Sequence, residues 1–283
     1  MKEWILNMIE AIAKGVDEGV IDDLAKTPKD YCGGAYNFVT DINNVAVKPV
    51  VAILLSIVFT MELARVSTKV DGDRTLGVKM VADSMFKMAL ILTASANSQL
   101  FLDAIFQIFN KVLVNLNKYI RDHGDLPPGG DDWSKAAKNS IGNWDYLGQA
   151  ACLVILLIPF LCAMAAQVAF KLMLILRFFE IFMYSAFAAL PVAFLASDDM
   201  RSMAIGFWRK YGSACVKNVT LIMGVYLYRV LLRTGSFYIK PPASKDSFVG
   251  WCFHNFAGLI LLPVLFIGIL GVSNSIAKAL CGE

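Results

Sequence analysis

The sequence predicts an all-α fold, a polytopic membrane bundle of about five or six transmembrane helices behind an N-terminal amphipathic helix. Two observations carry this prediction: the overall composition and one long apolar stretch. Of the 283 residues, 57% are hydrophobic and 17% are charged, whereas a soluble domain is about 45–50% apolar and about 25% charged. The net charge of +3 is too small to argue for a nucleic-acid-binding protein by itself.

The long apolar stretch covers residues 147–196 and contains only three formal charges, Lys171, Arg177 and Glu180. One crossing of a bilayer takes about 20 helical residues. The stretch is too long for one crossing and suits two, so we expect a helical hairpin over 147–196. A turn near Gln167 to Lys171 keeps Arg177 and Glu180 away from the centre of the lipid.

Four segments are expected along the chain. Residues 1–44 form an amphipathic helix and linker, 45–118 a first membrane region with two spans, 119–146 an extramembrane loop, and 147–283 the main membrane bundle. The loop contains Pro127, Pro128, Gly129 and Gly130, which break helices. After the hairpin, apolar runs predict spans at about 214–232 and about 253–272.

In the N-terminal segment, apolar residues recur at steps of three or four, which predicts one amphipathic helix over 1–26. They are Ile5, Met8, Ile9, Ile12, Val16 and Val20. The helix either lies on the membrane or a partner, or folds onto the protein's own bundle, and its mixed polar face does not decide between the two. Residues 99–118 pose a similar choice, because they either extend the span at about 79–96 or lie in the membrane interface.

The sequence contains none of the motifs for a phosphate-binding loop, a zinc protease or a nucleophile elbow. The six cysteines form no C-x-x-C pair, and with two histidines a histidine-based metal site is not expected. We interpret the cysteines as free buried thiols, in preference to disulfides or metal ligands. The chain is therefore expected to hold no cofactor and to be no enzyme.

Four charges lie in or beside apolar runs: Asp83, Lys87, Arg177 and Glu180. A charge in lipid costs about 2.5–3.5 kcal/mol on insertion scales, so such groups usually face protein or water. One interpretation is a polar lining or a subunit contact. The other is a bridge within each helix, because Asp83 and Lys87 are four residues apart and share a face.

A stretch expected to be a polar loop mixes basic and aromatic side chains: Arg201, Phe207, Trp208, Arg209, Lys210 and Tyr211. Basic groups beside aromatic rings can bind single-stranded nucleic acid by charge and stacking. The same mixture also anchors loops at a membrane interface. We prefer the anchor, formed by Arg201, Trp208, Arg209 and Lys210.

Small residues recur at every fourth position at the end of the hairpin. Ser185, Ala189 and Ala193 would form one stripe on one helix face. Such a stripe allows two helices to approach closely, so it predicts helix packing.

Several of these segments together resemble one protein family. They are the apolar hairpin, the segment RFFEIF, the helix AFAALPVAFLA and the polar stretch ending FWRKYG, all within about residues 147–235. They are similar to the TrbL-like proteins, polytopic inner-membrane subunits of conjugation machines and type IV secretion systems. The resemblance implies a multi-pass protein of the bacterial cytoplasmic membrane that helps form the translocation path for DNA–protein substrates. It also points to Trp208, with Arg209 beside it.

The resemblance implies partners as well. These are other secretion-system subunits including ATPases, further copies of this chain in a homo-oligomer, membrane lipid, and a single-stranded DNA–protein substrate in transit. The alternative is a stand-alone transporter or small-solute channel, although transporters often carry paired repeats and this sequence has none. A membrane-embedded enzyme is disfavoured, because the sequence lacks a clustered set of histidine, cysteine or acidic residues.

Overall fold

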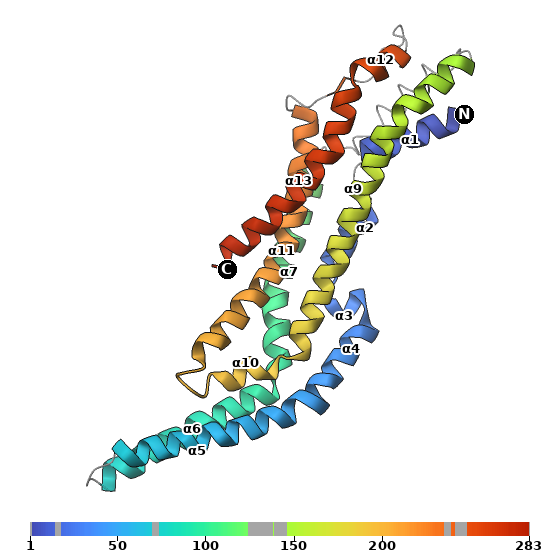
Figure 1. Ribbon diagram of the computed structural model, residues 1–283. Coiled ribbons are helices and arrows are strands. Elements are labelled where there is room, and N and C mark those ends of the chain that lie inside the picture. The colour runs from blue at the N-terminus through green and yellow to red at the C-terminus, as the bar shows by residue number, and fades with distance from the viewer. Residues whose placement is uncertain are drawn as a thin grey trace. The chain divides into compact units, whose positions relative to one another are not determined.

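The computed structural model describes residues 2–14, 18–69, 74–123, 138, 146–234, 239–240 and 248–282, and the regular elements among them are helices (Figure 1). The all-α prediction is confirmed. The chain divides into two compact units. Unit 1 contains Met1–Ala25, Val112–Leu176 and Lys217–Ile276, and unit 2 contains Lys26–Lys111, Arg177–Val216 and Ala277–Glu283. Most of the expected extramembrane loop at 119–146 lies outside the described residues, and its first residues, 119–123, continue the helix that precedes it.

Unit 1 is built around the N-terminal helix. The helices that contribute to it are α1 (Lys2–Lys14), α2 (Glu18–Ala25), the end of α7 (Ser98–His123), part of α9 (Tyr146–Ala186), part of α11 (Arg201–Thr234), α12 (Phe248–His254) and most of α13 (Phe256–Leu280). Ile5 and Ile9 of α1 are buried in one apolar cluster with Leu156 of α9 and Leu259 of α13. The Gln167 amide donates a hydrogen bond to the Ala11 carbonyl at 3.3 Å.

These contacts decide between the two interpretations of the N-terminal helix, because its apolar face packs onto the protein's own unit. The structure describes this segment as α1 and α2, and residues 15–17 between them lie outside the described part. Val16 and the side chain of Val20 therefore cannot be placed in this core. Trp4 points away from the core and is 70% exposed.

Unit 2 begins with short elements that lead into long helices. They are α3 (Pro28–Tyr31), α4 (Gly33–Ile42), the π-helix η1 (Asn43–Val47), α5 (Lys48–Lys69), α6 (Arg74–Ala96), part of α7 (Ser98–His123) and α10 (Ala189–Phe194). Thr27 caps α3 by accepting a hydrogen bond from the Asp30 N–H. The antiparallel helices α5 and α6 lie side by side, and α10 packs against both (Figure 1).

The predicted hairpin over 147–196 is wrong. The helix α9 runs without interruption for 41 residues, straight through Gln167 to Lys171. That segment contains no glycine or proline, so nothing in its local sequence ends a helix. The chain turns instead after Ala186, into the short helix α10, and again at 195–200. At 1.5 Å per residue α9 is about 60 Å long, so one long helix accounts for the apolar length that a hairpin would explain.

Four helical stretches are long and apolar enough to cross a membrane: Gly33–Thr68, Gly148–Ala186, Arg201–Leu231 and Phe256–Leu280. A fifth is possible if Gly77–Ala96 and Ser98–Tyr119, which meet at 65°, form one broken span. This bend leaves the choice for residues 99–118 open. The spans expected at about 214–232 and 253–272 fall within α11 and within α12 and α13. In the described residues the sixth span is missing, because it depended on the hairpin.

The outward faces of these helices are apolar. On α9, Val154 is 71% exposed, Leu161 57% and Val168 61%. A soluble monomer rarely exposes so continuous an apolar surface. An apolar outer surface of this kind is stable in contact with the hydrocarbon of a lipid bilayer.

Candidate functional site

The most unusual group in unit 2 is the guanidinium of Arg177, which is only 3% exposed. Its Nε donates a hydrogen bond to the Ala214 carbonyl at 3.4 Å. Among the described residues, neither terminal nitrogen of Arg177 has a hydrogen-bond acceptor. Glu180, one turn further along α9, attracts the guanidinium electrostatically. A buried cation without enough acceptors is costly, so Arg177 has bonding capacity that its own unit does not fill.

Mainly apolar walls surround this region of unit 2. The cluster consists of Leu102 and Phe106 from α7, Ile181 from α9, Ala188 from the turn before α10, and Tyr211, Ala214 and Cys215 from α11. Tyr211 donates its hydroxyl hydrogen to the Leu102 carbonyl at 3.0 Å. Beside Ala214, the buried Ser213 hydroxyl finds no partner in the described part of the chain. Unmet polar groups thus lie along both α9 and α11.

A second polar contact joins α4 to α7. The Tyr36 hydroxyl donates to the Asp103 carboxylate at 2.7 Å, and the pair is partly buried. The sequence interpretation missed this contact, because its partners are 67 residues apart. One signal was available: Asp103 is the only formal charge between Lys87 and Lys111.

The start of α10 is held by polar groups from two other elements. The Asn43 side-chain oxygen accepts from the Ala189 N–H at 3.4 Å, and the Ser95 hydroxyl donates to the Ala189 carbonyl at 3.5 Å. Because Asn43 and Ser95 are buried, these bonds satisfy groups that water does not reach. The Asn43 side-chain nitrogen has no hydrogen-bond partner within the described residues.

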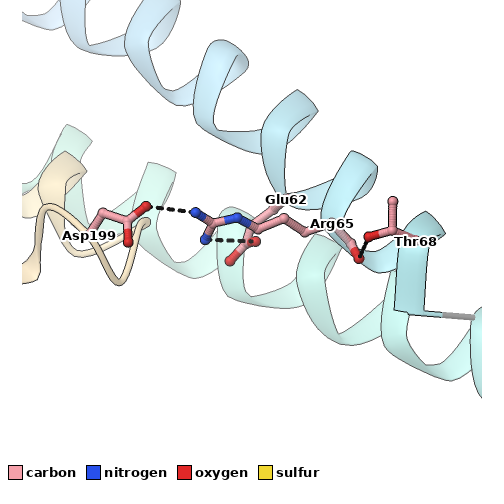
Figure 2. Close-up of polar contacts among 4 residues, drawn as sticks. All are labelled: Glu62, Arg65, Thr68 and Asp199. Atoms are coloured by element: carbon pink, nitrogen blue, oxygen red, sulfur yellow. Dashed lines mark hydrogen bonds and ion pairs between the residues drawn. The ribbon is translucent and has the colours of Figure 1, made fainter.

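An ion pair ties α5 to the turn that follows α10 (Figure 2). The Arg65 guanidinium lies 2.6 Å from the Asp199 carboxylate and 3.9 Å from that of Glu62. The Thr68 hydroxyl donates to the Arg65 carbonyl at 2.8 Å. The Arg65 and Asp199 side chains are 46% and 69% exposed. Pairs as exposed as this one orient a turn more than they stabilise a fold.

The four charges singled out from the sequence occupy different environments. Asp83 on α6 is exposed and Lys87 is partly exposed, and no ion pair between them is present in this described helix. Arg177 is buried and Glu180 is partly buried. These four residues therefore do not form one buried cluster, and their role as lining or subunit contact stays a prediction.

The stretch from Arg201 to Tyr211 is helical, so its description as a loop is wrong. It forms the start of α11, directly after Ser197, Asp198 and Asp199, residue types that favour helix N-termini. Arg201, Arg209 and Lys210 are exposed, and Trp208 is partly exposed.

The aromatic rings in this part of α11 contact one another. Phe207 meets Trp208 edge to face at 5.8 Å and Tyr184 of α9 at 5.3 Å. Tyr211 is 1% exposed and offers no free ring face for a nucleic-acid base. The arrangement therefore favours a packed anchor over a stacking platform, and the anchor stays a prediction.

The small residues Ser185, Ala189 and Ala193 do not share one helix. Ser185 lies near the end of α9, whereas Ala189 and Ala193 belong to α10. All three are buried. The two alanines pack against Val47, Val51 and Leu55 at the junction of η1 and α5, where small side chains allow close approach.

A family model described as "TrbL/VirB6 plasmid conjugal transfer like protein" matches residues 14–189, well over half of the chain. The match includes Asp83, Arg177 and the Tyr36–Asp103 contact but ends before Trp208 and Arg209. Neither a curated protein nor a solved structure matches this chain.

Proposed function

The chain belongs to the TrbL/VirB6 plasmid conjugal transfer-like family and is a multi-pass membrane protein of a conjugal transfer or type IV secretion apparatus. From this premise we propose that it is an inner-membrane channel or scaffold subunit that helps form the translocation path for a DNA–protein substrate. The observation that carries the proposal is the family match over 14–189, which spans two candidate membrane crossings and the broken pair.

We assign this role to the region of unit 2 around Arg177, where buried polar groups lie among apolar side chains. Arg177 retains two nitrogens without acceptors, and Ser213 on α11 retains an unmet hydroxyl. Such groups become favourable when a partner subunit, water or a passing substrate supplies acceptors. Asp83 and Lys87, on the exposed side of α6, are available for a contact with another subunit.

The proposed partners are the ATPases and other envelope subunits of the apparatus, together with further copies of this chain. The sequence carries no phosphate-binding motif, so the energy for transfer has to come from a separate ATPase. The exposed apolar faces of α5, α6 and α9 contact lipid or these partners. Exposed basic residues Arg201, Arg209 and Lys210 attract anionic groups, either lipid headgroups or the nucleic acid.

The test is a transfer assay in a donor strain that lacks this gene and carries it back on a plasmid. We expect deletion to abolish transfer and the wild-type gene to restore it. A photo-crosslinking amino acid at Arg209 should capture substrate DNA during transfer, whereas the same group at the lipid-facing Val154 should not. Normal transfer by the deletion strain would contradict the proposal, and equal capture at both positions would contradict a defined path.

The competing function, a stand-alone transporter or small-solute channel, is tested separately. The purified protein is reconstituted alone into vesicles, and solute flux is measured against empty vesicles. We expect no flux above that control. Specific flux that saturates with solute concentration would favour the transporter and remove the main proposal.

A further inference from the structure

Two of the six cysteines are brought together from segments a hundred residues apart. Cys152 lies near the start of α9 and Cys252 lies in α12, and both are 0% exposed. The two thiols lie close enough to interact with one another. Both belong to the apolar core of unit 1, with Leu156 and Leu259.

This contact is part of a regular pairing of two helices. On α9, Gly148 precedes Cys152 by four residues, so the two share a face. On α12, Val249 precedes Cys252 by three residues and likewise shares its face. A Cβ at Gly148 would lie 3.9 Å from the Val249 Cγ2 atom. The two helices therefore touch at matching positions, which holds the two sulfurs in place.

The short helix α12 is also fixed at its other contacts. The Trp251 indole donates to the Lys240 carbonyl at 2.9 Å, and the Asn255 amide donates to the Trp251 carbonyl at 2.9 Å. Ile239 packs into the same core as the two cysteines. The Lys240 contact and the packing of Ile239 place α12, and with it Cys252, in the same core as Cys152.

We propose that Cys152 and Cys252 form a disulfide bond in the mature protein, which fastens α12 to the start of α9. Each thiol loses a proton and the pair gives up two electrons. A disulfide oxidant, either a dithiol oxidoreductase or a small-molecule disulfide, takes up the two electrons and two protons and is reduced to two thiols. In the structure Cys152 and Cys252 are both free thiols, as the sequence analysis expected, and the proposal departs from that state because the two thiols lie together in one core.

Burial decides when the bond forms. A thiol with no exposed surface does not react with an external disulfide, so the bond forms while α12 packs against α9, when the two sulfurs already approach each other and an oxidant still reaches them. The bond then forms during insertion and persists as a structural link. Disulfides persist in oxidising compartments, so the proposal also places the start of α9 and helix α12 on the oxidising side of the membrane.

The test uses wild-type protein in isolated membranes. Free thiols are blocked with N-ethylmaleimide under denaturing conditions, and the protein is digested without reductant for mass spectrometry. We expect the peptides of Cys152 and Cys252 to appear linked, two hydrogen masses lighter than their sum, and to separate with dithiothreitol. Cys162 also lies on α9 but faces no second cysteine in the described structure. It should therefore carry N-ethylmaleimide.

N-ethylmaleimide on both Cys152 and Cys252 in the isolated protein would overturn the proposal. Linkage that appears only after copper phenanthroline is added would also overturn it, since that result shows reduced thiols in contact. In C252S we expect Cys152 to become fully labelled and α12 to become more accessible to protease. If C252S does not accumulate, the wild-type peptide map still decides.

Discussion

Unit 1 and unit 2 treat their buried polar groups differently. In unit 1, the Tyr226 hydroxyl donates to the Asn117 side chain at 2.6 Å, and the buried Tyr228 hydroxyl donates to the Leu262 carbonyl at 3.3 Å. In unit 2, buried polar atoms of Asn43, Ser98, Asn110, Arg177 and Ser213 have no hydrogen-bond partner within the described residues. Asn218 is the corresponding case in unit 1.

This difference in hydrogen bonding suggests different roles for the two units. A core whose polar groups are bonded is complete by itself, whereas unmet buried groups carry a cost that a binding event can relieve. Unit 1, closed around the N-terminal helix, is suited to hold the protein in the bilayer. Unit 2 is suited to receive something from outside, which is why the proposed translocation role is assigned to it.

The largest expected effect tests whether the two units are independent. Leu156→Ala in the core of unit 1 should cost about 2–5 kcal/mol, because it leaves a cavity at a fully buried site. Val154→Ala, on the exposed face of the same helix, should cost far less. Thermal unfolding in detergent measures both, with limited proteolysis to locate the change. Simultaneous loss of protease resistance in unit 2 would show that the two units unfold as one.

Arg177→Met in unit 2 should raise the stability of the fold, whereas Leu156→Ala in unit 1 lowers it. Replacing a buried cation whose two terminal nitrogens lack acceptors by an apolar side chain of similar length should stabilise the fold. Transfer should fall by about tenfold, the effect of losing one charge-assisted hydrogen bond of about 1.4 kcal/mol to a partner. The melting temperature and the transfer frequency are measured in parallel. A destabilised protein with normal transfer would contradict the assignment of unit 2.

A smaller effect is expected where α11 meets α13 in unit 1. At Gly224, a Cβ would lie 2.7 Å from the Ser273 hydroxyl and 3.0 Å from a methyl of Ile269. Gly224→Ala should therefore destabilise by about 1–3 kcal/mol through overpacking. Gly268→Ala, with nothing within 4 Å, should stabilise by about 0.5–1 kcal/mol through helix propensity. Equal melting temperatures for the two variants would show that unit 1 is not closely packed here.

The smallest effect is expected at the exposed ion pair of unit 2. Arg65→Ala and Asp199→Ala should leave the melting temperature close to that of the wild type, because solvent screens both side chains. The double variant should behave like either single one. A marked loss of stability at low ionic strength that salt does not change would show that the pair is shielded by a partner.

The sequence was sufficient for the fold class and for one core face. Composition separated the chain from soluble proteins, and the spacing of Ile5, Ile9 and Ile12 identified the buried side of α1. It was not sufficient to count the spans. Apolar length cannot distinguish one helix of 41 residues from two shorter ones, so α9 was divided where no breaker residue exists.

Contacts between segments far apart in the chain could not be predicted from the sequence either. Arg177 could be recognised as unusual, but its lack of acceptors depends on where α11 packs. The pairing of Tyr36 with Asp103 and that of Cys152 with Cys252 required the helices to be arranged in space. Periodicity identifies a face of one helix, and it does not identify what that face meets.

The length of α9 and the positions of its charges indicate how deep each part of this helix lies in the membrane. Residues 148–170 carry no formal charge and extend about 35 Å as a helix, close to the hydrocarbon thickness of about 30 Å. If residues 148–170 fill the hydrocarbon layer, Lys171 lies at the lipid headgroups. The last 16 residues of α9, 171–186, then extend about 24 Å beyond the hydrocarbon. Arg177, although buried within unit 2, then lies at a level outside the hydrocarbon, where water rather than lipid surrounds the protein.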